Sequence, residues 1–308
     1  LAGGLTTVAS GSSVYKMTFG TLDGLAVKSV PFESIRYSTR NPRGRRTLRA
    51  AFERVWKHLR DVEVYERLKR EDPKAKKPDE KWIRGDFAKA KRLIEGDAVA
   101  LVTANRTHEI LQYTDLARKY GFKLVVRGAR EGHLVAGDLA RAGATCIVTP
   151  RTRADRDPQR MRENGSSPEN ASILHNHGVP VIVMPRSGSI SLMGLAGQDL
   201  AHLPMEAAFA VRGGMSQAAA IDAITIEPAR LMGLDHRVGT IEVGKDADFA
   251  ITDGDLLHYM TLVQQTIVNG RVAYDKDEDS LYGHIRPAGE DDAPPPNDHW
   301  PRRLGEDW

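Results

Sequence analysis

Cysteine is almost absent from this sequence of 308 residues, which contains only Cys146. One thiol excludes a disulfide within the chain and a zinc site built from several cysteines. The sequence also lacks any apolar run close to the ~20 residues of a membrane-spanning helix. Neither charge is in large excess, with 44 Lys and Arg against 41 Asp and Glu, so the bulk charge does not favour nucleic acid or a membrane as a partner.

The remaining composition is typical of a folded globular protein, with 41% hydrophobic and 28% charged residues. The length suffices for one large domain and a small appendage. Leu1–Gly4 runs directly into the β-branched segment Thr6–Ala9. We therefore expect an N-terminal segment before Leu1, on the same or another polypeptide. For a soluble protein, a cytoplasmic and a periplasmic or secreted location both stay open.

Between residues 98 and 213, short apolar segments alternate with segments of helical spacing. Apolar strands of this kind, separated by helices, predict a parallel sheet covered on both faces. The repeated strand–helix units fit a barrel or a doubly wound α/β sheet. The expected strands are Ala98–Thr103, Lys123–Val126, Cys146–Thr149 and Pro180–Met184. The expected helices are Thr107–Tyr120, Glu131–Ala142, Ser167–His175 and Met205–Gly213.

The N-terminal third is less regular. Thr6–Ala9 and Gly24–Val30 are predicted strands, and Phe87–Glu95 is a predicted helix. Apolar residues at helical spacing predict a helix over Thr47–Arg70, with Thr47 as its N-cap after a basic loop at Pro42–Arg46. The lysines of Asp72–Glu80 indicate a solvated linker.

The pattern changes after residue 215. Ser216 is expected to cap a helix that ends at Ala223, and Pro228–Leu234 is predicted as another helix. Strands follow at Asp248–Thr252 and Gln265–Asp275, and Asn269-Gly270 is a strong hairpin signal. The polar segment from Lys276 contains three consecutive prolines, and its tryptophans suggest that it lies along a surface, its own or a partner's.

Residues 220–274 resemble the C-terminal signature of the amidohydrolase superfamily, near its imidazolonepropionase-like branch. The matching runs are Ala223–Ala229, Leu234–Ile241, Gly244–Asp248 and Thr266–Val272. Ala2–Val8 resembles the second barrel strand of that family. The resemblance implies a (β/α)8 TIM-like barrel over residues 1–233, whose first strand is missing from this chain. It also implies a small β-sandwich portion at 234–275, followed by an extended tail at 276–308.

The resemblance implies one or two divalent metals, held by histidines, an aspartate and often a carbamylated lysine at the strand ends. The fifth-strand positions hold Thr103 and Asn105, the sixth-strand position holds Gly128, and the eighth holds Arg186. Such residues do not build a zinc site of nitrogen and oxygen ligands. Lys28 is placed at the end of a barrel strand, where a carbamylated lysine would lie, but an ordinary lysine at the rim is the preferred interpretation.

The histidines give no clear replacement ligands. His175 and His177 have metal-ligand spacing, but they precede the eighth strand and therefore belong to the N-terminal rim, opposite the usual active-site rim. His108 and His133 follow the fifth and sixth strands and are displaced from the ligand positions, which favours solvated or satisfied side chains. His202 follows the eighth strand and could face the barrel mouth.

Arginines instead follow the predicted strands at the C-terminal rim. Clustered guanidiniums repel a metal and need anions, either carboxylates of the chain, an acidic partner segment, or a phosphate or carboxylate ligand. We expect Arg106, Arg127 and Arg186 to form an anion site together with Thr103 and Asn105. Arg151 and Arg153, in a loop, are expected to point outward. Arg130 also follows a strand at this rim, and the backbone donors of Ser187–Ser189, beside Arg186, are a weak signal.

Three functions remain open. The first is a non-catalytic amidohydrolase homologue without a metal cofactor, acting as a structural or regulatory subunit or binding an anion. It would form a homo-oligomer, or a hetero-oligomer with an active relative or an N-terminal fragment. The second is a hydrolase of C–N bonds using zinc or another divalent metal, with ligands from the missing first strand plus Lys28 or His108. The third is metal-free chemistry by the arginines, for which no nucleophile or base is evident.

Overall fold

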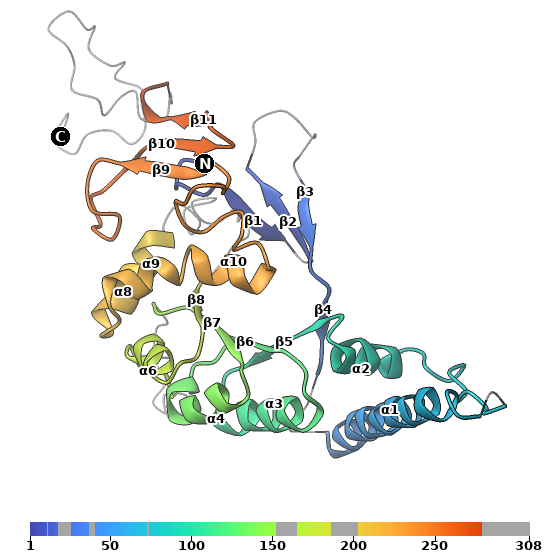
Figure 1. The fold of residues 1–308 in the computed structure, drawn as a ribbon. Helices are drawn as coiled ribbons and strands as arrows, with labels where there is room; N and C mark the ends of the chain where they lie inside the picture. Colours follow the sequence, from blue (N-terminus) through green and yellow to red (C-terminus); the bar gives the residue numbers. More distant parts are fainter. Residues whose placement is uncertain are drawn as a thin grey trace, which may run out of the picture.

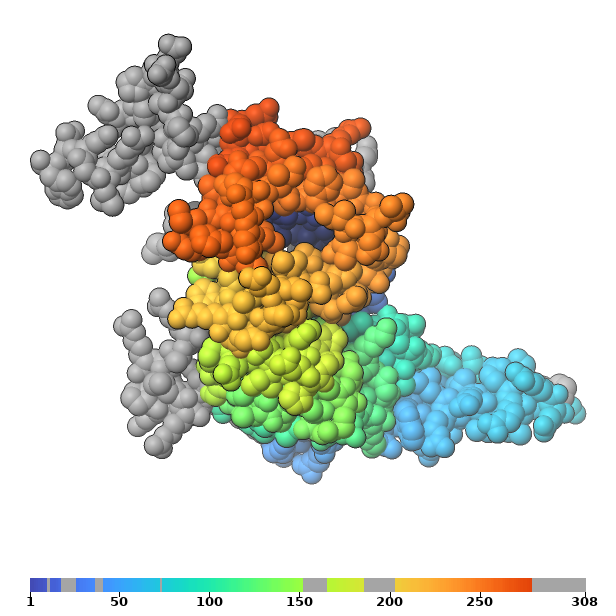
Figure 2. Space-filling model, turned by 60° about the vertical axis from the view of Figure 1, so that its left-hand side comes forward, coloured from blue at the N-terminus to red at the C-terminus, as the bar shows by residue number. Residues whose placement is uncertain are grey.

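The computed structural model describes residues 1–10, 12–17, 26–36, 41–72, 74–151, 165–185 and 203–278. A parallel sheet with its helices forms the centre of the molecule (Figure 1). Antiparallel strands from both ends of the sequence lie together on one side of it, and the long helix α1 projects on the other. Figure 2 shows this projection in blue and cyan beside the rounded body.

The central sheet contains five parallel strands in chain order, β4-β5-β6-β7-β8. These strands are Phe32–Ser34, Val99–Ala104, Leu124–Gly128, Thr145–Val148 and Val181–Val183. Their apolar side chains pack against the following helices, with Val102, Val126 and Cys146 inside the main core. The predicted α/β alternation is confirmed for this region.

The helices between and after these strands agree closely with their predicted positions, and α3 has the predicted bounds. The described helices are α1 (Pro42–Leu68), α2 (Asp86–Glu95), α3 (Thr107–Tyr120), α4 (Ala136–Arg141), α6 (Asn170–Asn176), α8 (Leu203–Arg212), α9 (Gln217–Asp222) and α10 (Ile226–Met232). The short 3-10 helix η1 (Gly132–Val135) precedes α4. Ser216 caps α9, as predicted, by accepting the N–H of Ala219.

The first strands do not belong to the parallel sheet, which corrects the comparison of Ala2–Val8 with a barrel strand. β1 (Thr7–Ser10) and β3 (Ala26–Ser29) both pair antiparallel with β2 (Ser13–Lys16), a strand that the sequence did not reveal. Only two residues join β1 to β2. Such a connection closes a hairpin, whereas parallel neighbours need a crossover of a dozen residues or more. The parallel strand β4 begins just after the predicted strand Gly24–Val30.

Helix α1 begins earlier than predicted. Asn41 is its N-cap and accepts the N–H of Gly44 at 2.9 Å, and Pro42 occupies the first turn, where a missing N–H is harmless. Thr47 is therefore not the cap, and its hydroxyl donates to the carbonyl of Arg43. The segment predicted as a basic loop is the first turn and a half of this helix.

The C-terminal sheet has the order β11-β10-β9, from Arg271–Asp275, Val263–Val268 and Phe249–Thr252. Asn269 and Gly270 form the predicted hairpin turn, with φ angles of +51° and +75°. Both residues tolerate this left-handed region. The short 3-10 helix η2 (Lys276–Glu278) ends the described part of the chain.

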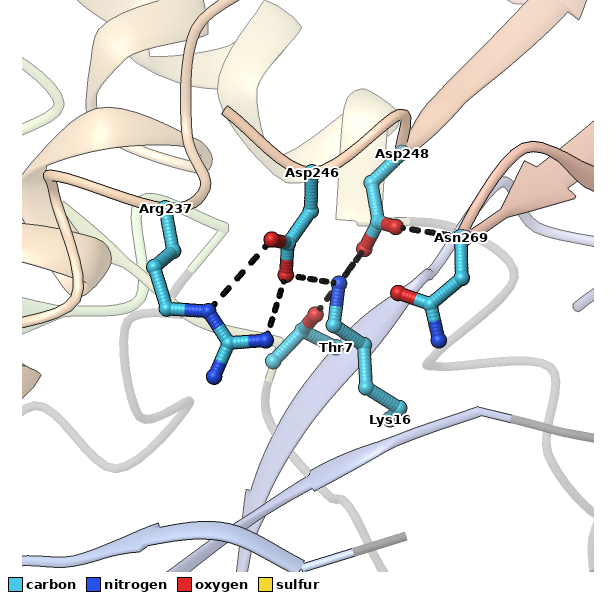
Figure 3. A network of polar contacts seen from close by, with 6 residues as sticks. All are labelled: Thr7, Lys16, Arg237, Asp246, Asp248 and Asn269. Atoms are coloured by element: carbon cyan, nitrogen blue, oxygen red, sulfur yellow. Dashed lines mark hydrogen bonds and ion pairs between the residues drawn. The ribbon is translucent and has the colours of Figure 1, made fainter. Parts of the chain in front are cut away.

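A buried lysine joins the two ends of the sequence (Figure 3). Lys16 on β2 is 1% exposed, and its Nζ lies 2.5 Å from Asp248 Oδ2 and 2.9 Å from Asp246 Oδ2. Arg237 binds Asp246, and the N–H of Asn269 donates to Asp248. The N-terminal hairpin is thereby fixed to the segment that leads into β9.

Candidate functional site

The ends of β5 and β6 bring two of the predicted site residues together. Thr103 lies in register with Arg127 on the neighbouring strand, and both side chains are exposed. Their neighbours Val102 and Val126 point into the core beneath the helices. Because successive strand residues point to opposite faces, Thr103 and Arg127 lie on the face of the sheet away from α3 and α4.

Asn105 and Gly128, at two positions where the resemblance implies metal ligands, pack against each other. Gly128 has a φ of +95°, in the region that favours glycine. A Cβ at Gly128 would overlap the Oδ1 atom of Asn105. The asparagine side chain therefore fills the space into which a side chain on β6 would extend.

Two carboxylates near this point are bound to backbone donors. Glu109 accepts the N–H groups of Asn105 and Arg106 at 3.2 and 3.3 Å. Glu131 accepts both the N–H and the hydroxyl of Thr107, at 2.6 and 2.8 Å. These contacts satisfy the N–H groups of the two residues before α3 and of its first residue, which have no partner within the helix. Arg106, predicted as an anion ligand, is the half-buried residue that precedes this helix.

A cavity of about 180 Å³ lies beside Gly128, at the C-terminal ends of β6 and β7. Its polar lining comes from Arg130, Thr149, Ser166, Ser167 and Asn170. Asn170 is 8% exposed and holds the cavity wall, since it donates to the carbonyl of Ala129 and accepts the N–H of His133. The cavity has room for a small ligand rather than a single water, and Arg130 gives it a positive charge.

Arg151, after β7, does not simply point outward as predicted. Its backbone N–H and its Nε donate to the carboxylate of Glu206 at 3.1 and 2.9 Å. Glu206 lies on α8 and is 0% exposed. A carboxylate of the chain thus neutralises this arginine, one of the three sources of negative charge that were expected. Arg153, Arg186, Ser187–Ser189 and His202 lie outside the described residues.

Lys28 lies on β3 of the antiparallel sheet rather than at the end of a parallel strand. Its Nζ donates to the carbonyl of Gly233 at 2.8 Å, just after the end of α10. A lysine at a helix C-terminus interacts favourably with the last carbonyls. The structure therefore gives Lys28 a role at the end of a helix, away from the strand ends of the central sheet.

Among the described residues, His108, His133 and the pair His175 and His177 lie on different elements. His108 is exposed on α3, and His175 and His177 are exposed before β8, at the opposite end of the sheet from the cavity. His133 is in η1 and its Nδ1 atom is buried. Among the described residues, no three His, Cys, Asp or Glu side chains form a group that could hold a metal. Burial raises the pKa of the Cys146 thiol to about 12, which keeps it protonated.

The sequence profile of the amidohydrolase family matches residues 19–277. The chain belongs to the amidohydrolase family. An amidohydrolase from Thermotoga maritima has a similar structure, with a TM-score of 0.67 and 21% identity, over 89% of this chain and 73% of that one. This likeness supports the fold, an α/β architecture with a parallel sheet consistent with a TIM barrel.

Curated relatives match shorter stretches of the present chain. The N-acetylglucosamine-6-phosphate deacetylase of Danio rerio is 34% identical over 90 residues, 29% of this chain and 19% of that protein. The amidohydrolase tasK of Hapsidospora irregularis is 31% identical over 99 residues, 31% of this chain and 10% of that protein. The chain thus spans about a fifth or less of the length of these relatives. No helix in the described ranges is long and apolar enough to cross a membrane.

The sequence pattern did not single out Glu109, Glu131, Glu206 or Asn170. Glu109 could have been found, because an acid in the third position of a helix is a capping signal. The other three act on residues 24 to 55 positions away along the chain, so no local pattern reveals them.

Proposed function

We propose that this chain is an amidohydrolase-family protein that has lost the metal-dependent hydrolase site and acts as a non-catalytic, anion-binding homologue. The packing of Asn105 over Gly128 carries this proposal. If only a ligand side chain had been lost, an empty space would remain beside Gly128. Instead, the side chain of Asn105 fills that space, and the backbone at Gly128 has a conformation that favours glycine. We further propose that β4–β8 are part of a (β/α)8 barrel of the imidazolonepropionase-like branch.

The chemistry of the donors supports the proposal. A zinc or manganese site needs three or more nitrogen or oxygen ligands from the protein. Around Gly128, Thr103 and Asn105 supply neutral oxygens only. Glu109 is bound to the N–H groups of Asn105 and Arg106, just before α3, and Glu131 is bound to Thr107, the first residue of α3. The described residues at these strand ends therefore do not fit a metal.

Arg130 and the hydroxyl groups around it instead fit an oxyanion. A guanidinium binds phosphate or carboxylate with two parallel hydrogen bonds, and serine and threonine add further donors. The deacetylase relatives are named for a substrate that carries a phosphate group. We therefore propose a phosphate or carboxylate group as the ligand of the cavity, in a regulatory or structural subunit rather than an enzyme.

Elemental analysis and thermal unfolding of the purified chain test the two parts of this proposal. We expect no stoichiometric zinc, manganese or iron, and a rise in Tm with inorganic phosphate at constant ionic strength. Arg130→Gln should abolish the phosphate effect, whereas Arg118→Gln, an exposed arginine on α3, should keep it. One bound metal ion per chain would refute the loss of the metal site. A Tm that phosphate leaves unchanged would refute the anion site.

The alternative is a metal-dependent hydrolase of amide or cyclic amide bonds, with ligands from a segment before Leu1. The similarity to proteins named deacetylases favours it. This alternative requires a His-x-His pattern upstream of Leu1 in the intact protein, and sequencing that region decides whether the pattern exists.

A further inference from the structure

The arm formed by α1, α2 and the segment between them (residues 42–95) projects from the body of the molecule (Figures 1 and 2). Its inner face is apolar: Ala51, Phe52, Val55 and His58 of α1 are buried. Trp82 packs against His58 and Phe87 and lies 4.1 Å below the guanidinium of Arg54. Phe52 also packs against Tyr120 and Phe122 of the central body, and Phe52 and Val55 belong to the main core, so the first half of α1 is anchored to the body. The face of α1 opposite these residues is largely exposed.

That outer face of α1 is basic along most of its length. Residues three or four positions apart share one face of a helix, and those opposite the buried residues are Arg46, Arg49, Glu53, Lys57, Arg60, Asp61, Val64, Arg67 and Leu68. This face has two acidic residues, Asp61 and Glu53, and Glu53 is bonded to Lys119 at 2.7 Å. Five cations therefore follow one another over about 32 Å, at 1.5 Å of rise per residue.

Charge is divided unevenly along the sequence. Residues 42–95 contain 18 Lys and Arg against ten Asp and Glu, whereas residues 276–308 contain four against nine. The nearly neutral total hides a basic arm and an acidic C-terminal segment. Opposite net charges of this size attract each other, so the basic arm and the acidic segment can form an interface whose assembly is steered by charge.

The outer face also carries apolar residues that favour a protein partner over a nucleic acid. Val64 and Leu68 are each 48% exposed and lie one helical turn apart, beside Arg60 and Arg67. The acidic segment has Trp300, Leu304 and Trp308, which recur at the same spacing of four. Apolar anchors surrounded by charged groups are typical of protein interfaces, whereas phosphate backbones are contacted mainly by cations and hydrogen-bond donors.

We propose that the outer face of α1 binds the acidic C-terminal segment, residues 276–308, of a second copy of this chain. The last described residues, Lys276–Glu278, follow β11, at the opposite end of the molecule from α1 (Figure 1). Two copies in antiparallel arrangement bring each arm to the C-terminal end of the other. A two-fold dimer of this kind makes the same contact twice and closes.

Charge reversal in the chain of residues 1–308 tests this proposal. One variant carries glutamates in the arm (Lys57→Glu, Arg60→Glu and Arg67→Glu), and a second carries lysines in the acidic segment (Asp291→Lys, Asp292→Lys and Glu306→Lys). Analytical ultracentrifugation should show a dimer of the parent chain at low salt that dissociates near 1 M salt, where the screening length is about 3 Å. Each variant alone should dimerise about tenfold more weakly or worse.

Mixing the two variants should restore the dimer, because each arm then meets a segment of opposite charge. A control variant (Arg118→Glu, Lys123→Glu and Arg212→Glu) has the same change of net charge as the arm variant. It alters exposed side chains outside the arm and should dimerise like the parent chain. A monomeric parent chain at low salt would overturn the proposal, as would a mixture that stays monomeric. Duplex DNA that binds the parent chain, and not the arm variant, while dimerisation is the same in both, would assign the outer face to nucleic acid instead.

Discussion

At Gly128, backbone conformation and packing impose the same restriction. The φ of +95° disfavours every residue with a Cβ, and the space for that Cβ is occupied by Asn105. A histidine at this position, as the family resemblance implies for relatives, would need both the backbone and Asn105 to move. The residues on β5 and β6 are therefore coupled, which supports a single rearranged site more than two unrelated substitutions.

Gly128→Ala should lower the free energy of unfolding by about 2–4 kcal/mol, the sum of a strained backbone and an overpacked contact. Gly143→Ala is the matched control: its φ is +59° and no atom lies within 4 Å of the added Cβ, so about 1–2 kcal/mol of backbone strain is expected. Chemical denaturation measures both. Adding Asn105→Ala to Gly128→Ala should recover the packing part, and equal costs for the two glycines would contradict the proposed contact.

At the scale of helices and strands, the sequence was most informative where one element carries its own boundary signals. The bounds of α3 were predicted correctly because Gly121, in the left-handed conformation, ends the helix. For α1, apolar spacing alone predicts an N-cap at Thr47, whereas the helix begins about one and a half turns earlier, where Asn41 caps it and Pro42 occupies the first turn. The strands β1 and β3 were recognised, but not their antiparallel pairing, since pairing depends on β2, which has no strong pattern of its own.

The contact between α8 and the end of β7 could not be predicted, because Arg151 and Glu206 are 55 residues apart. Arg151→Met would leave Glu206 buried without its ion pair, and we expect a loss of about 3–5 kcal/mol in the free energy of unfolding. Arg212→Met, at the exposed end of the same helix, should change it by about 0.5 kcal/mol or less. The double variant Arg151→Met/Glu206→Met should regain most of the loss. If the single variant is as stable as the parent chain, Arg151 does not neutralise Glu206.

For the whole molecule, the two ends of the sequence form one polar centre that no local pattern indicated. Lys16 and Asp248 are 232 residues apart, yet their side chains meet in the interior. The run Gly244–Asp248 was recognised as part of a family signature, and the structure supplies the physical reason for two of its residues: Asp246 and Asp248 neutralise a buried lysine. The candidate site was predicted only in part for a similar reason. The sequence shows which residue types follow each strand, but it does not show which residues of other elements they contact.

Lys16→Met should lower the free energy of unfolding by about 3–5 kcal/mol at pH 7, because two carboxylates lose a buried partner. Burial raises the pKa of Asp246, but hydrogen bonds from Lys16 and Arg237 outweigh it and hold that pKa below its ordinary value. Such an acid stabilises the folded chain above its ordinary pKa of about 4, and the effect is lost as the pH falls through the lower folded value. The difference between the parent chain and Lys16→Met should therefore shrink on acidification from pH 7 to about pH 3. Lys123→Met, at an exposed position, should show neither effect, and a pH-independent difference would mean that Lys16 acts by packing alone.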